Sequence, residues 1–207
     1  MRITLIDAGK RFNRDWIFRH LHYEFLLGHT YAITGPNGSG KSTLLQAIAG
    51  SIGISEGTVR YEPGRGGADV SDDQVFRHIS IGAPYLEVIE EMTVTELLHF
   101  HQSFKPFLPS WSIEDIVAKM GLAVAAHKQI RYYSSGMRQR VRLAQAIFSD
   151  TPVMLLDEPC TNLDLEGITL YRQLIRDHSA GRTVIISSND LQEYDFCENT
   201  LSILDYK

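Results

Sequence analysis

A run of glycines followed by a lysine, a serine and a threonine has the residue types and spacing that phosphate binding requires. The run comprises Gly35, Pro36, Asn37, Gly38, Ser39, Gly40, Lys41, Ser42 and Thr43. Glycines allow the backbone to wrap closely around phosphate groups and to point successive N–H groups at them. The lysine can reach the terminal phosphates, and the serine hydroxyl can bind Mg²⁺. The pattern predicts a P-loop that binds ATP or a related triphosphate, rather than a glycine-rich turn with an incidental lysine.

Two carboxylates follow an apolar run in the second half of the chain. Asp157 and Glu158 come directly after Val153–Leu156, which has the composition of a buried strand. Ligands of open α/β folds bind at the carboxyl ends of such strands. We therefore expect Asp157 to bind Mg²⁺ and Glu158 to polarise an attacking water. Alone, such a pair also fits the solvated start of a loop, but together with the P-loop it indicates a catalytic role.

Strands and helices alternate along most of the chain, and this alternation positions the two motifs. The P-loop lies between an expected strand at Thr30–Thr34 and a helix over Ser42–Ala49, the context that a P-loop requires. Other expected strands are Ile3–Ile6, Thr58–Tyr61, His78–Ile81, Val153–Leu156, Thr183–Ser187 and Thr200–Leu204. Other expected helices are Thr93–Phe104, Ile113–Met120, Gly136–Phe148 and Leu165–His178. The alternation predicts an α/β fold with a mainly parallel sheet flanked by helices.

The middle of the chain has a different pattern. From Tyr85 to about Tyr133 the periodicity is mostly helical, with interruptions at Pro106 and Pro109. We interpret this segment as a helical subdomain inserted into the sheet domain. Glycines, a serine and aspartates predict a loop over residues 62–73.

The composition narrows the class of protein. The chain has 207 residues, of which 43% are hydrophobic and 22% charged, an ordinary globular profile that excludes a disordered chain. A net charge of −5 argues against general electrostatic capture of nucleic acid, so no nucleic-acid partner is expected. No run approaches the roughly 18 apolar residues of a membrane helix. Cys160 and Cys197 are too few for a disulfide scaffold, and we expect a soluble, cytoplasmic chain.

Two further motifs give the chain a family resemblance. Residues Tyr133–Arg140, read Tyr-Ser-Ser-Gly-Met-Arg-Gln-Arg, resemble the signature motif of the ATP-binding cassette (ABC) ATPases, Leu-Ser-Gly-Gly-Gln. Asn162–Asp164 resembles the D-loop of that family, Gly35–Thr43 matches its P-loop closely, and the motifs stand in the family's order. The resemblance covers the chain from Ile3 to Leu204.

The resemblance implies a fold and a domain organisation. It implies a P-loop NTPase fold with an N-terminal antiparallel β part and an inserted helical subdomain. Residues 1–207 would form one ABC ATPase domain, with residues 1–84 and 134–207 as the core and about 85–133 as the helical subdomain.

The resemblance also implies binding roles for residues outside the P-loop. Ser134 and Gly136 would contact the γ-phosphate of ATP bound to an opposing cassette, in a homodimer or a heterodimer, although a serine N-cap of an amphipathic helix explains Ser134 equally. Phe12 stands where the family places an aromatic residue that stacks on adenine, with Trp16 and Phe18 as nearby competitors.

Four positions depart from the family's pattern. Tyr85 stands where a glutamine is expected, and it lacks the amide carbonyl that would bind Mg²⁺ or orient water. Asn189 stands in place of the switch histidine, and asparagine can donate to a γ-phosphate but cannot carry a positive charge. In the signature, Ser135 replaces a glycine and Met137 a glutamine. These replacements predict slow hydrolysis with intact ATP binding.

The resemblance implies the ATP-hydrolysing subunit of an ABC transporter, peripheral on the cytoplasmic face of the membrane. Its partner would be a separate integral membrane permease subunit, docked on the segment Tyr85–Tyr133. Two alternatives stay open: a soluble ABC ATPase, for example in iron–sulfur assembly, and a degenerate regulatory cassette that binds ATP with little hydrolysis. The sequence gives neither the transported substrate nor the direction of transport.

Overall fold

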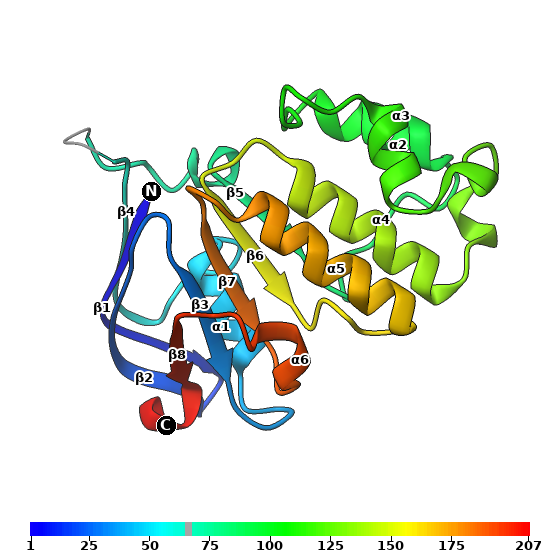
Figure 1. The fold of residues 1–207 in the computed structure, drawn as a ribbon. Coiled ribbons are helices and arrows are strands. Elements are labelled where there is room, and N and C mark those ends of the chain that lie inside the picture. Colours follow the sequence, from blue (N-terminus) through cyan, green and yellow to red (C-terminus); the bar gives the residue numbers. More distant parts are fainter. Residues whose placement is uncertain (65–67) are drawn as a thin grey trace.

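Two β-sheets and the helices around them make up the computed structural model, which describes residues 1–64 and 68–207 (Figure 1). The described strands are β1 Arg2–Phe12, β2 Asp15–Phe25, β3 Thr30–Thr34, β4 Glu56–Glu62, β5 Ile79–Gly82, β6 Val153–Asp157, β7 Thr183–Ser187 and β8 Asn199–Ser202. The described α-helices are α1 Lys41–Ile48, α2 Val94–Gln102, α3 Ile113–Lys119, α4 Ser135–Phe148, α5 Leu165–His178 and α6 Leu191–Tyr194. Short 3₁₀ turns cover Val75–Arg77, Ala123–Ala125, Ile130–Tyr132 and Ile203–Tyr206.

The larger sheet is parallel, with the strand order β5-β6-β7-β3-β8. All residues of β6 and β7 are buried, as expected for strands that are covered on both faces. Alternate residues of β6 enter two different cores: Met154 and Leu156 face α4 and α5, whereas Val153 and Leu155 face α1 and the smaller sheet. The predicted α/β fold with a parallel sheet flanked by helices is confirmed.

The smaller sheet is antiparallel, with the order β2-β1-β4, and it supplies the N-terminal β part that the resemblance implied. The strand β2 was not predicted. Its buried residues Phe18, Leu21 and Phe25 are three and four apart because the pairing with β1 shifts register around Asp7 and His20, both with positive φ. These bulges break the alternation by which a strand is recognised.

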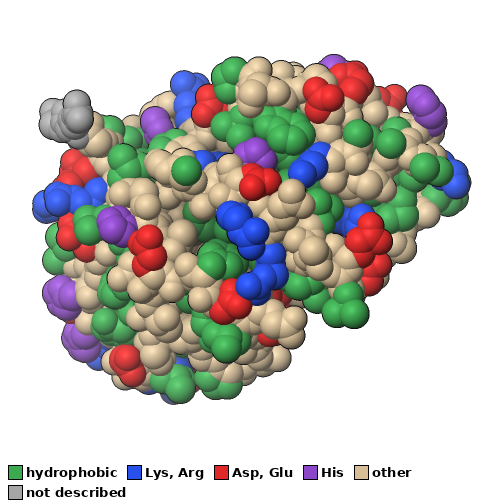
Figure 2. Space-filling model, in the orientation of Figure 1, with side chains coloured by type: hydrophobic (Ala, Val, Ile, Leu, Met, Phe, Trp, Pro, Cys, Tyr) green, Lys and Arg blue, Asp and Glu red, His purple; other side chains and the backbone are tan. Residues whose placement is uncertain are grey.

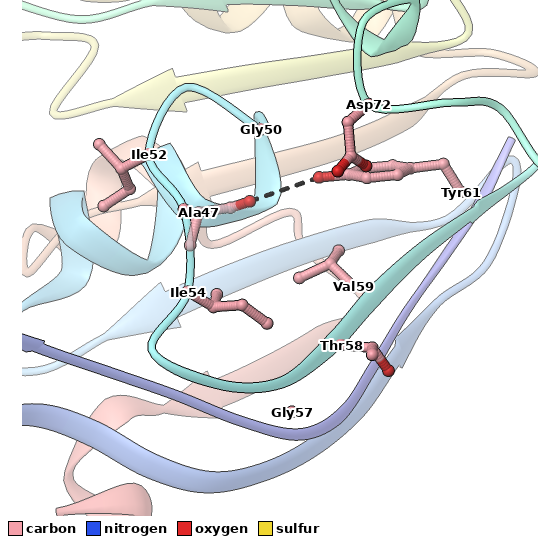
Figure 3. A pocket seen from close by; sticks show the side chains of 10 residues that line it. Ala47, Gly50, Ile52, Ile54, Gly57, Thr58, Val59, Tyr61 and Asp72 are labelled. Carbon is pink, nitrogen blue, oxygen red and sulfur yellow. Dashed lines mark hydrogen bonds between the residues drawn. The ribbon is translucent and has the colours of Figure 1, made fainter.

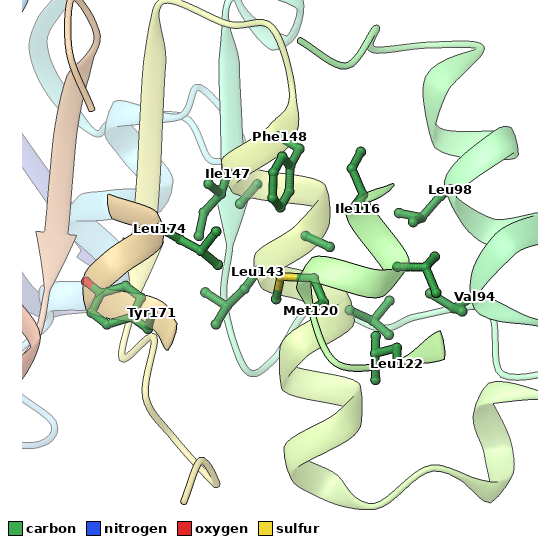
Figure 4. Close-up of a cluster of buried hydrophobic side chains, with 14 of the residues drawn as sticks. Val94, Leu98, Ile116, Met120, Leu122, Leu143, Ile147, Phe148, Tyr171 and Leu174 are labelled. Atoms are coloured by element: carbon green, nitrogen blue, oxygen red, sulfur yellow. The ribbon is translucent and has the colours of Figure 1, made fainter. Parts of the chain in front are cut away.

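The segment after β5 is helical, and two of its helices begin with side-chain caps. The Thr93 hydroxyl accepts from the backbone N–H of Glu96, whose carboxylate accepts in return from the Thr93 N–H, and Ser112 caps α3 in a similar way. Figure 4 shows Val94 and Leu98 of α2 beside Ile116 of α3, in a cluster of buried side chains that continues through Leu143 of α4 to Leu174 of α5.

Several predicted boundaries differ from the structure. The strand expected at Thr200–Leu204 ends at Ser202 and continues as the 3₁₀ turn Ile203–Tyr206. Of the loop predicted over residues 62–73, residues 65–67 lie outside the described part of the chain. Among the described residues, no helix is long and apolar enough to cross a membrane. Acidic and basic side chains are interspersed over the face shown in Figure 2.

Candidate functional site

The P-loop connects the end of β3 to the start of α1, at the carboxyl edge of the parallel sheet (Figure 1). Gly35, Gly38 and Gly40 have φ values of 147°, 75° and 99°, a region that favours glycine. A Cβ at Gly35 would lie 2.7 Å from the Ser39 hydroxyl, and one at Gly40 would collide with Ile17. The chain therefore needs glycine at positions 35 and 40 for the loop to close as it does.

Lys41 lies inside this loop. Its side chain is 4% exposed, and its ammonium donates to the carbonyl oxygens of Gly35 (2.9 Å) and Pro36 (3.3 Å). Asn37, Gly38, Gly40, Lys41, Ser42 and Thr43 line one pocket together with Glu158 and Ile17. The structure thus brings most of the predicted phosphate-binding residues together with the predicted base. Ile17 of β2 was missed, because only the tertiary contact of the hairpin with the loop reveals it.

The helix that carries Lys41 is anchored at its other end by Tyr61 of β4. The Tyr61 hydroxyl donates to the carbonyl oxygens of Ile48 (3.1 Å) and Ala47 (3.4 Å), as Figure 3 shows for Ala47. The last carbonyl groups of a helix have no partner in the regular hydrogen-bond pattern of the helix, and Tyr61 supplies a donor to two of them. Burial raises the pKa of the Tyr61 phenol, which stays protonated and keeps donating. Both ends of α1 are therefore fixed to the rest of the protein.

Asp157 ends β6 and is 1% exposed. Burial raises the pKa of its carboxyl group, whereas the hydroxyls of Ser42 and Ser187 and the charge of Lys41 lower it. Its Oδ1 has no hydrogen-bond partner within the described residues. Burial of an unpaired carboxylate oxygen is costly, and a divalent cation would offset that cost. Ser42 and Asp157 fit Mg²⁺, which is commonly held by one or two protein ligands together with substrate phosphates and water.

Glu158 follows with a φ of 41°, which is unusual for a residue that is not glycine. Its backbone N–H donates to the Ser187 carbonyl oxygen over 2.8 Å, which ties the residue to the neighbouring strand β7. Its side chain lines the P-loop pocket. A carboxylate in this place can accept a proton from a water that attacks a bound phosphate.

Of the four replaced positions, Asn189 contacts the P-loop and Tyr85 lines a neighbouring groove. Asn189 donates from Nδ2 to the Asn37 Oδ1 over 3.0 Å, so the switch position contacts the P-loop directly. Tyr85 is 43% exposed and has a pKa raised by burial and by Asp157, while a hydrogen bond with Gln46 lowers it. Its side chain lines a neighbouring groove together with Gln46.

The three aromatic candidates for adenine stacking differ in exposure. Phe18 is fully buried in the core, and Trp16 lies beneath the Arg19 guanidinium, 4.4 Å from the ring centroid. Phe12 is 50% exposed at the end of β1, with the Lys10 ammonium 4.9 Å from its ring. Of the three, Phe12 is the most exposed.

The signature residues form a separate pocket. Ser134 caps α4 by accepting from the Met137 N–H over 3.2 Å, and a Cβ at Gly136 would lie 2.8 Å from the Asn162 carbonyl oxygen. Ser134 and Gly136 line this pocket with Ser135, Met137, Arg140, Asn162, Leu163 and Asp164. Within one chain, the signature residues are absent from the described lining of the P-loop pocket.

Comparisons with known proteins agree with the motifs. A family model described as "ABC transporter" matches residues 18–161. The chain is 32% identical over 195 residues to the cytochrome c biogenesis ATP-binding export protein CcmA of Rhizobium meliloti (strain 1021), over 91% of this chain and 90% of that protein. It is 28% identical over 201 residues to the uncharacterized ABC transporter ATP-binding protein YybJ of Bacillus subtilis (strain 168), over 92% and 87%.

Solved structures share the fold. A putative ABC transporter ATP-binding protein of Pyrococcus furiosus has a TM-score of 0.82 and 20% identity, with 100% of both chains covered. A bacterial Atm1-family ABC exporter with ATP bound has a TM-score of 0.79 and 20% identity, over 97% of this chain and 37% of that one.

Proposed function

The chain belongs to the ABC transporter family, and from that premise we propose that it is the ATP-hydrolysing subunit of a transporter whose membrane domains are separate chains. One observation carries the hydrolysis in this proposal, and the family carries the transporter role. The P-loop pocket is lined by Glu158, and the adjacent buried Asp157 has a carboxylate oxygen without a partner among the described residues. A site that only bound the nucleotide would need no base in this place.

The P-loop would hold the triphosphate through its backbone and its lysine. The free N–H groups at the start of α1 and the positive end of the helix favour a phosphate group. When phosphate enters, Lys41 exchanges the carbonyl oxygens of Gly35 and Pro36 for phosphate oxygens, a stronger charge-assisted contact. Phe12 would stack on the adenine.

Ser42 and Asp157 are the residues that would hold Mg²⁺. When bound, Mg²⁺ neutralises charge on the phosphate oxygens. Glu158 orients the attacking water and accepts its proton. Asn189 donates from its amide toward the γ-phosphate, without the positive charge of a protonated histidine. We infer a slow reaction from this weaker electrostatic stabilisation.

A second cassette would complete the site. The family resemblance assigns Ser134 and Gly136 a contact with a γ-phosphate, and both line a pocket separate from the P-loop pocket, so we infer that this ATP is held by a second cassette. Two chains would then close head to tail around two ATP molecules, as a homodimer or as a heterodimer.

An apolar groove beside α1 is the surface that we propose for a permease subunit. It lies between the end of α1, β5 and the start of the helical segment, and it exposes Phe76 (52%) and Tyr85 (43%). Its lining comprises Gln46, Ala49, Ser51, Ile52, Phe76, Ile79, Ile81, Tyr85, Leu86 and Lys105. The groove therefore combines core residues with the segment from Tyr85 onward.

The occupant would be a short cytoplasmic segment of the membrane subunit, which would hold this chain on the cytoplasmic face of the membrane. The names of the CcmA relatives favour export.

The experiment is purification from detergent-solubilised membranes of the source cells. We expect an integral membrane protein to bind this chain and, once reconstituted in vesicles, to stimulate its phosphate release. The variant Phe76→Asp should lose both the binding and the stimulation, because Phe76 lines the groove. Leu204→Asp is the matched control, since Leu204 is 50% exposed outside the groove and outside Tyr85–Tyr133 and should keep both. Isolation from the soluble fraction alone would contradict a transporter role and favour a soluble ABC ATPase.

The second candidate function is a regulatory cassette that binds ATP with little hydrolysis. Tyr85 and Asn189 favour it, because both replace groups that contribute to hydrolysis in the family. The retained Glu158 opposes it. A phosphate-release measurement decides between the two functions.

A further inference from the structure

The residue proposed as the catalytic base has a strained backbone. Glu158 has a φ of 41°, a conformation that costs a non-glycine residue free energy and persists only when neighbouring contacts hold it. Two of those contacts are its own backbone bonds: its N–H donates to Ser187 O (2.8 Å), and its carbonyl oxygen accepts from Thr161 N–H (3.1 Å).

Two buried side chains from separate helices hold the next two residues. Gln139 of α4 donates from Nε2 to the Pro159 carbonyl oxygen over 2.9 Å. Glu193 of α6 accepts the Cys160 N–H at Oε1 over 2.7 Å. Gln139 is 1% exposed and Glu193 is 4% exposed, so water competes little with either bond. The backbone directly after Glu158 is therefore held by two separate helices.

The burial of Glu193 is energetically unfavourable in itself. Its Oε2 has no partner within the described residues, and burial raises the pKa of the carboxyl group. An apolar side chain would avoid the desolvation penalty of a half-paired carboxyl. The bond to the Cys160 N–H is a contact that an apolar residue of similar size could not make.

The two helices come from segments that the proposed function uses. Helix α4 begins at the signature residues, and α6 begins two residues after Asn189. We propose that Gln139 and Glu193 are positioning residues of the ATPase site, which hold the Pro159–Cys160 backbone so that the Glu158 carboxylate faces the P-loop pocket. This inference rests on the proposed function. Misplacement of a catalytic group by about 1 Å can reduce a rate roughly 100-fold.

The experiment measures Mg-ATP affinity and steady-state phosphate release for a set of purified variants. Glu193→Met and Gln139→Leu remove the two bonds with little change in volume. We expect each to lower kcat at least about tenfold and to leave the Mg-ATP dissociation constant within about twofold. Glu193→Gln keeps an oxygen that accepts the Cys160 N–H, so it should restore most of the rate.

Tyr171→Phe is the matched control for loosening of α6. The Tyr171 hydroxyl donates to the Glu193 carbonyl oxygen over 2.8 Å but has no bond to Pro159 or Cys160. This variant should keep its rate. A wild-type rate in folded Glu193→Met would overturn the proposal, and so would a loss in Tyr171→Phe as large as that in Glu193→Met.

Hydrogen exchange at the Cys160 amide separates this inference from the proposed function. A wild-type chain that binds Mg-ATP but releases no phosphate would contradict the proposed hydrolysis. The positioning role would then be decided by exchange alone: faster exchange in Glu193→Met but not in Glu193→Gln supports it, and equal exchange in all three proteins overturns it.

Discussion

Asn189 donates a hydrogen bond from its side-chain amide to the side-chain oxygen of Asn37, over 3.0 Å. The loop that follows β7 is thereby joined to the P-loop at the position where the family places its switch histidine. Both residues are exposed, so a bound γ-phosphate can compete for the same amide donor. The contact makes Asn189 the residue whose replacement tests the departures from the family pattern.

Asn189→His should speed ATP hydrolysis. Loss of one positioned electrostatic contact costs well-studied enzymes roughly 2.7–4 kcal/mol, or about two to three orders of magnitude in rate. We expect the histidine to raise the hydrolysis rate at least about tenfold. The rate should stay below that of a complete site because Tyr85 still stands where the family has a glutamine. The double variant with Tyr85→Gln should gain more. Fast ATP hydrolysis by the wild type that neither substitution changes would show that another residue acts as the switch.

Lys41→Ala should weaken Mg-ATP binding at least about tenfold, because a charge-assisted phosphate contact is worth on the order of 1.5–3 kcal/mol. Calorimetric titration measures this loss. Lys128→Ala removes an exposed lysine that lies outside the P-loop pocket and should bind as the wild type does. Equal Mg-ATP affinities in all three proteins would contradict the assignment of residues 35–43 as a P-loop.

Glu158→Gln should form an ATP-dependent dimer. The variant slows hydrolysis while it leaves Ser134 free to bind phosphate across the interface, so size-exclusion chromatography in ATP should show a shift from monomer to dimer. Ser134→Arg in the same background should abolish the shift, whereas Ser110→Arg, at an exposed serine outside the signature pocket, should not. A dimer that persists in Ser134→Arg would place the interface elsewhere.

The stability of the fold should decrease in mild acid through His101. This imidazole stacks on Phe107 and contacts the Ser149 hydroxyl, and burial, with a smaller effect of Lys105, lowers its pKa to about 4 from 6.5. Well above pH 6.5 the ring is neutral in both the folded and the unfolded state and has no effect on stability. Between pH 6.5 and about 4 the unfolded chain binds a proton that the folded chain does not, so the free energy of unfolding falls.

The fall should be at most about 3 kcal/mol. Urea unfolding at a series of pH values measures it, and His101→Gln should flatten the curve in this window. An unchanged slope in the variant would contradict the assignment of this pH dependence to His101.

The elements whose characteristic residues follow one another in a continuous run could be predicted from the sequence. The P-loop has its glycines, lysine and serine in one continuous run, and β6 and β7 are continuous apolar runs because both of their faces are buried. The buried positions of β2 follow no regular alternation, since the bulges near Asp7 and His20 interrupt it.

Contacts between segments that are distant in the sequence produce no recognisable residue pattern. Ile17, Gln139 and Glu193 each contact the P-loop or the segment after Glu158 through tertiary packing. A glutamine on a helix after the signature and a glutamate in a short helix after Asn189 look like ordinary polar residues in the sequence. Their burial, visible only in the folded chain, distinguishes them.

Steady-state phosphate release from Mg-ATP by the wild-type chain and by Glu158→Gln tests most directly whether this chain hydrolyses ATP with Glu158 as its base. We expect measurable hydrolysis by the wild type and a loss of at least about 100-fold in the variant, with equal Mg-ATP affinity. Hydrolysis that continues at the wild-type rate in Glu158→Gln, or a wild-type chain that binds Mg-ATP and releases no phosphate, would contradict this expectation.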